Sequence, residues 1–206
     1  MNLKASLAYL LTPSFLMWCA SAQSASLNLQ ITDAAGLIAS DTVAYAEPAS
    51  GQTLAKAPRT AAQIEQKARR FVPSVTVIQT GTAVSFPNHD SVRHQVYSFS
   101  PAKVFELKLF SGAGGDPVLF DKPGTVIVGC NIHDQMAAYI QIVDTPWFGK
   151  ADATGKLVID NLLPGKYHLK FWHPNLPANS TPPEQLITVN TADMVMPIVL
   201  NFKTQR

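Results

Sequence analysis

The sequence GCNIHDQM at residues 129–136 is the stretch that decides how the rest of this chain is interpreted. It places a thiol, an imidazole and a thioether at three-residue intervals, at Cys130, His133 and Met136. Short apolar segments rich in β-branched residues flank it on both sides, which is typical of strands. We therefore expect a tight loop between two strands that turns these three side chains toward one point.

A fourth ligand candidate lies upstream at His94, the first residue of an apolar segment that continues through Tyr97. His89 in the same loop is the alternative, and we favour His94 because it directly precedes the expected strand. Two histidines and one cysteine with a weak axial methionine form the ligand set of a type 1 copper site. Thiolate and thioether are soft ligands, and imidazole also suits copper. The set predicts one copper ion that cycles between Cu(I) and Cu(II).

At these residues the chain resembles the cupredoxins (blue copper proteins), and its Cys-x-x-His-x-x-Met spacing is like that of amicyanin. The segments FPNHDSVRHQVYSFS and GCNIHDQMAAYIQIVDTP are similar to exported bacterial proteins called plastocyanin-like or methylamine-utilisation proteins. The resemblance covers roughly residues 70 to 145. It implies a Greek-key β-barrel that holds copper through His94, Cys130, His133 and Met136.

Four further residues are expected near the ion as outer-shell groups. Many cupredoxins have Asn directly after the first histidine, whereas this chain has the longer Gln95. That difference bears on the hydrogen bonding between the two ligand loops. Asp90 and Asp134 are interpreted as solvated loop carboxylates. The expected outer-shell residues are His89, Asn88, Gln95 and Asn131.

Residues 1–22 have the three-part layout of a secretory signal peptide, with Lys4, an apolar run and the small residues of Ala20–Ala22. The apolar run is shorter than the roughly 20 residues that a membrane span needs. We therefore expect a periplasmic protein with no stable membrane span after cleavage. Cys19 would leave with the signal, so Cys130 would be an unpaired thiol in an oxidising compartment, for which metal ligation is a good reason.

The remainder is predicted to be all-β, because its apolar segments are short and separated by Gly and Pro turns. Residues 61 to 70 are the one plausible helix. Strands are expected at Leu27–Ile31, Thr42–Ala46, Val75–Gln79, Thr82–Phe86, Gln95–Phe99, Val104–Leu109, Pro117–Phe120, Gly124–Val128, Ala137–Val143, Lys156–Ile159, Tyr167–Trp172, Gln185–Val189 and Met194–Phe202.

The blocks on either side of the cupredoxin-like segment carry a second resemblance. LNLQITDAAGLIASDTVAYAEP and GKADATGKLVIDNLLPGKYHLKFWHP look like the first and later parts of a carboxypeptidase-regulatory-like (prealbumin-type) β-sandwich. We therefore predict one sandwich that is split by an inserted cupredoxin domain. Its first strands would occupy residues 23–58, the cupredoxin domain residues 61–145, and the remainder of the sandwich residues 146–206.

A formal net charge of +2 gives no electrostatic footprint for nucleic acid. No Ser-His-Asp, paired-carboxylate or phosphate-loop pattern stands out, which gives ordinary hydrolase chemistry no support. Four protein ligands would also leave no open position on the copper for a substrate, so we do not expect an enzyme. The leading interpretation is a one-electron carrier with redox protein partners in the periplasm. The alternatives are copper storage or delivery, or an envelope protein that binds a partner or a glycan without redox turnover.

Overall fold

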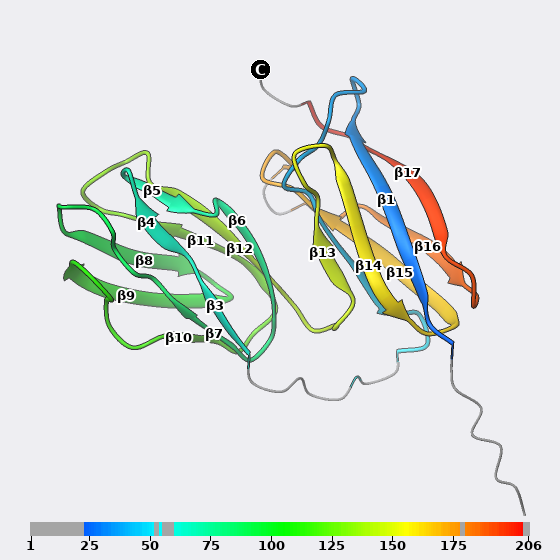
Figure 1. The fold of residues 1–206 in the computed structure, drawn as a ribbon, viewed down its shortest axis with the longest axis horizontal. Helices are drawn as coiled ribbons and strands as arrows, with labels where there is room; N and C mark the ends of the chain where they lie inside the picture. The colour runs from blue at the N-terminus through cyan, green and yellow to red at the C-terminus, as the bar shows by residue number, and fades with distance from the viewer. Residues whose placement is uncertain (1–22, 52–53, 55–59, 178–179, 204–206) are drawn as a thin grey trace, which may run out of the picture.

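The computed structural model describes residues 23–51, 54, 60–177 and 180–203, which form two packed β-modules (Figure 1). Strands are the regular elements throughout these residues, and the all-β prediction is confirmed. None of the described residues forms a helix long and apolar enough to cross a membrane. The predicted signal peptide at residues 1–22 lies outside the described residues.

The first module, drawn in green and cyan in Figure 1, is a barrel-like sandwich of two main sheets. A five-stranded sheet runs β6-β12-β11-β8-β9, and a three-stranded sheet runs β10-β7-β3 beside a β4-β5 hairpin. Its strands are β3 (Ala61–Gln63), β4 (Glu65–Lys67), β5 (Arg70–Val72), β6 (Val75–Gln79), β7 (Thr82–Ser85), β8 (His94–Ser100), β9 (Lys103–Phe110), β10 (Val118–Phe120), β11 (Gly124–Gly129) and β12 (Ala137–Val143).

Alternation of side chains in β11 and β12 builds the core of this module. In β11 Val126 and Val128 are fully buried, whereas Ile127 between them is half exposed on the outer face. Ile140 of β12 is buried in the same core and pairs with Val126 across the antiparallel ladder. Every strand expected in this segment is present, and β6 and β12 begin and end at the predicted residues.

The short helix predicted over residues 61 to 70 is wrong, because this segment contains β3, β4 and the start of β5. Backbone groups of Ala61–Gln63 pair in parallel with β7. Ile64 and Gln66 are completely buried, and the Gln66 amide donates a hydrogen bond to the Phe86 carbonyl at 2.8 Å. Tertiary pairing therefore outweighs the helix propensity of a local sequence rich in Ala, Gln and Arg.

The second module is a sandwich of a β14-β1-β17 sheet and a β13-β2-β15-β16 sheet. β1 alternates between buried and partly buried residues along its whole length, as predicted, and its inward side chains include Leu27, Leu29 and Ile31. It pairs antiparallel with β14 and parallel with β17. The strands are β1 (Ala25–Asp33), β2 (Val43–Pro48), β13 (Phe148–Lys150), β14 (Lys156–Leu162), β15 (Gly165–Trp172), β16 (Glu184–Val189) and β17 (Met194–Leu200).

Strands that precede and follow the barrel in sequence thus share one sandwich, whose core has no residue in common with the barrel core. The prealbumin-like character of this sandwich and the division of the chain at residues 23–58, 61–145 and 146–206 remain our proposal. A separate apolar cluster joins the modules, and the Tyr139 and Trp172 rings meet there with centroids 5.5 Å apart. Its buried members are Val43, Tyr45, Val75 and Val143.

Candidate metal centre

One end of the barrel brings together a thiol and two imidazoles. His94, Cys130 and His133 each offer a ligand atom, and these atoms all lie within 4.8 Å of one another. Cys130 Sγ lies 3.8 Å from Nδ1 of His94, and the His94 and His133 rings meet edge to face with centroids 5.0 Å apart. His94 is completely buried and Cys130 nearly so. Among the described residues, these three side chains form the group whose donor atoms could hold a metal ion.

Two separate pieces of chain supply these side chains. His94 opens β8, whereas Cys130 and His133 occupy the loop between β11 and β12. That loop is a tight turn, in which the Met136 amide donates to the His133 carbonyl at 2.9 Å. Met136 is 1% exposed and packs in the same core cluster as Cys130. The loop therefore carries a buried thioether into the same core as Cys130.

The hydrogen bonding and spacing of the donor group fit a metal ion. Nδ1 of His133 is buried and has no hydrogen-bond partner, a state that normally costs free energy. Metal–sulfur and metal–imidazole bonds are about 2.3 and about 2.0 Å long for zinc, so an ion can bridge donors that lie up to about 4.3 Å apart. The 3.8 Å between Cys130 Sγ and His94 Nδ1 meets that limit. The group fits a soft or borderline transition-metal ion, and its sulfur and imidazole donors suit copper.

Asp90 has a role at this site that differs from the sequence interpretation. It is not a solvated loop carboxylate, because its Oδ2 lies 2.8 Å from Nε2 of the buried His94. Burial by itself raises the pKa of Asp90, but hydrogen bonds from the Arg69 amide, His94 and the Ala68 amide together hold that pKa below its usual value. The Asp-x-x-x-His spacing was the one signal for this contact in the sequence, and it is weak without the fold.

Three of the predicted outer-shell residues, Asn88, Gln95 and Asn131, differ from one another in burial and in hydrogen-bond partners. Asn88 is buried, and its amide donates to the Val92 and Phe110 carbonyls at 2.9 Å each. Gln95 is bonded to Glu106 of β9 instead of joining the ligand loops. Asn131 is exposed at the start of the ligand loop.

His89, the alternative to His94, lies outside the donor group. Its side chain is 51% exposed and its Nε2 approaches Glu65 at 4.0 Å. His94, by contrast, has no exposed side-chain surface. The fold therefore separates two histidines that lie five residues apart in one loop.

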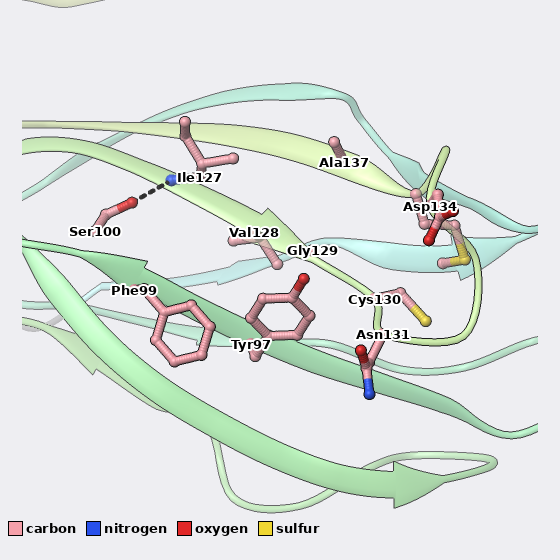
Figure 2. A pocket seen from close by; sticks show the side chains of 11 residues that line it. Tyr97, Phe99, Ser100, Ile127, Val128, Gly129, Cys130, Asn131, Asp134 and Ala137 are labelled. Atoms are coloured by element: carbon pink, nitrogen blue, oxygen red, sulfur yellow. Dashed lines mark hydrogen bonds between the residues drawn. The ribbon is translucent and has the colours of Figure 1, made fainter. Parts of the chain in front are cut away.

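A groove of about 470 Å³ runs along β8 and β11 to the Cys130 loop (Figure 2). Figure 2 shows the Tyr97 ring beside Gly129, with Cys130 following where the chain leaves β11. Tyr97 and Gly129 are paired across the two strands, and a Cβ on Gly129 would lie 3.1 Å from the Tyr97 ring. Glycine at this position lets an aromatic ring pack directly on the backbone that carries Cys130.

No family model and no curated protein matches the chain. Solved structures do match part of the chain, and cupredoxins are among them. A purple cupredoxin from Nitrosopumilus maritimus is 24% identical over 40% of this chain and 99% of its own, with a TM-score of 0.33. Amicyanin from Paracoccus versutus is 14% identical over 48% of this chain and 98% of its own, with a TM-score of 0.37. A copper-containing nitrite reductase from Thermus scotoductus is 22% identical over 48% of this chain and 26% of its own, with a TM-score of 0.39.

The donor group and its surroundings define a class of site. A barrel of two main β-sheets holds buried Cys and His donors, and the same loop carries a buried methionine; this donor set fits a type 1 copper site. The second sandwich packs against this barrel through the separate apolar cluster to which both modules contribute residues.

Proposed function

We propose that this protein is a periplasmic type 1 copper protein that transfers single electrons between redox protein partners. The observation that carries the proposal is the group formed by the buried His94 and Cys130 and the half-buried His133, whose donor atoms lie within 4.8 Å of one another. A copper ion held there would supply one-electron chemistry by alternating between Cu(I) and Cu(II). The barrel would hold the donor atoms in place, so that few atoms have to move when the electron is transferred.

We assign the equatorial ligands to His94, Cys130 and His133, and the axial ligand to Met136. Three of them come from one short loop, and the fourth begins a strand of the same five-stranded sheet that β11 and β12 share. A ligand set on one strand end and on a tight loop between two hydrogen-bonded strands is held in place before any ion binds. Burial of His94, Cys130 and Met136 excludes water from their side of the site.

Electron transfer is favoured over catalysis at the metal by the number of protein donors. Four protein ligands would leave no open position for a substrate, so we propose a carrier and not an enzyme. His133 is the half-buried member of the group, and Ile132 beside it is 50% exposed. This apolar edge is where a redox partner would approach the site most closely.

The spectrum of the purified protein with Cu(II) tests the assignment. An intense thiolate-to-copper charge-transfer band that disappears on reduction is expected for the wild type and is expected to be absent from the isosteric Cys130→Ser variant. Copper bound without that band would mean a different geometry and would favour storage or delivery. A wild-type protein that binds no copper would contradict the ligand assignment.

A matched pair of histidine variants tests which residue of the upstream loop is the ligand. His94→Ala should lose the charge-transfer band, whereas His89→Ala should keep it, because the His89 side chain is half exposed and outside the donor group. The reverse pattern would overturn the assignment of His94.

The location is tested separately. We infer export from the signal-like residues 1–22 and expect the chain recovered from a periplasmic extract to begin directly after Ala22. Mass spectrometry of its N-terminal peptide decides this. A chain that keeps residues 1–22 and remains with the membrane fraction would contradict the periplasmic assignment.

A further inference from the structure

Asp90 contacts a ligand of the site that we propose and a turn of a separate hairpin. Its Oδ2 lies 2.8 Å from Nε2 of His94, and the same oxygen accepts the Arg69 amide at 2.8 Å. Its Oδ1 accepts the Ala68 amide at 2.7 Å. The carboxylate, whose side chain is 14% exposed, therefore joins the β4-β5 turn to a histidine with no exposed side-chain surface.

The turn that holds Asp90 has an unusual backbone. Ala68 and Arg69 form the two-residue connection between β4 and β5, and both have positive φ angles, 52° and 55°. Hairpin turns of this kind favour Asn and Gly, because other residues rarely adopt the left-handed region. Here two successive amides in that conformation point to one carboxylate, which is the arrangement of an anion-binding backbone concavity. Asp90 fills that concavity from within the chain.

The loop that carries Asp90 is fixed as well. The Asp90 amide donates to Oδ1 of Asn88 at 2.9 Å, and the Asn88 amide group is itself bonded to the Val92 and Phe110 carbonyls. Asn88 is 4% exposed, so this network is shielded from water. The carboxylate thus has little freedom to leave His94.

An ionised carboxylate only accepts hydrogen bonds, so Nε2 of His94 must donate to it. In the neutral imidazole, a proton on Nε2 leaves Nδ1 as the nitrogen with a free lone pair, and that atom faces Cys130 Sγ at 3.8 Å. A hydrogen-bonded partner of this kind sets the tautomer, the ring orientation and the basicity of a metal-binding histidine.

We propose that Asp90 is the positioning residue of the metal centre, which holds His94 in the tautomer and orientation that the ion requires before the ion binds. The proposal rests on the copper site proposed above. It assigns to the Ala68–Arg69 turn the task of holding the Asp90 carboxylate in place, which explains why a strained turn lies next to the site.

The experiment compares the wild type with Asp90→Ala and Asp90→Asn. Nitrogen-15 NMR of the metal-free protein reads the His94 tautomer directly, and competition with a chelator measures Cu(II) affinity. We expect a single Nε2–H tautomer in the wild type, a tautomer mixture in D90A, and an affinity for Cu(II) that falls about 10- to 100-fold. Should the D90A chain fail to fold, the isosteric D90N variant carries the test.

Asp134→Asn is the matched control, because it removes the same charge from the ligand loop without touching a hydrogen bond to a ligand. If D90A and D90N keep the wild-type tautomer and an affinity equal to that of D134N, Asp90 has no positioning role. The tautomer measurement needs no metal. A wild type that binds no copper would therefore refute the proposed function, while the NMR result would still decide the role of Asp90 toward His94.

Discussion

Substitution of His133 by leucine should stabilise the metal-free protein while removing a ligand. Nδ1 of His133 is buried and has no hydrogen-bond partner, and a buried polar atom in that state costs about 1–3 kcal/mol. Leucine has no polar atom to leave unpaired, so the free energy of unfolding of the metal-free His133→Leu variant should rise by about 1–3 kcal/mol. Urea unfolding followed by circular dichroism measures the difference.

Copper should reverse this order. Binding to the native state at about 1,000 times the dissociation constant adds about 4.1 kcal/mol to the free energy of unfolding of the wild type, which exceeds the gain expected for His133→Leu, and nothing to a variant that does not bind. His89→Leu is the control, because the His89 side chain is half exposed, and its free energy of unfolding should change by no more than about 0.5 kcal/mol. A metal-free His133→Leu protein that is no more stable than the wild type would refute the reasoning that the unpaired nitrogen of His133 destabilises the metal-free protein.

Three further predictions concern the sandwich module and the axial ligand. Gly155 and Gly36 share a φ of 77°, but a Cβ on Gly155 would lie 2.6 Å from a backbone oxygen whereas one on Gly36 meets nothing within 4 Å. Gly36→Ala should therefore cost about 1–2 kcal/mol from the left-handed backbone alone, and Gly155→Ala at least about 1 kcal/mol more; equal costs by urea unfolding would contradict this. Burial lowers the pKa of His173, although the Ser40 carbonyl and Asp41 oppose the shift. The unfolded chain therefore binds more protons than the native one below about pH 6.5, and the free energy of unfolding should fall there, less so in His173→Gln. Met136→Leu should raise the reduction potential, measured by voltammetry, because an apolar side chain offers Cu(II) no axial donor; an unchanged potential would remove Met136 from the ligand set.

The sequence by itself determined the features that depend on short spacings. The three-residue intervals of Cys130, His133 and Met136 bring these residues close together in any tight loop between strands, and such a loop is present. Alternating burial along β1 follows in the same way from the period of two, because successive side chains of a strand point to opposite faces. Local patterns of this kind do not depend on which other strands the chain meets.

Tertiary structure decided whatever depends on pairing between distant segments. Residues 61 to 70 have helix-forming composition, yet parallel pairing with β7 and the burial of Ile64 make them strands. The sequence favours His94 over His89 because His94 directly precedes the strand, but burial is decided by the fold: the barrel core covers the His94 side chain and leaves that of His89 half exposed.

The contact of Asp90 with His94 was also outside the reach of the sequence. It requires that the β4-β5 turn lies beside the loop after β7. The Ala68 and Arg69 amides then donate to the Asp90 carboxylate, which is also hydrogen-bonded to His94. Composition identified that residue only as a charged loop position, because the free energy that places it comes from hydrogen bonds to a different part of the chain. Ligand types are thus encoded locally, whereas the orientation of each ligand is a property of the folded barrel.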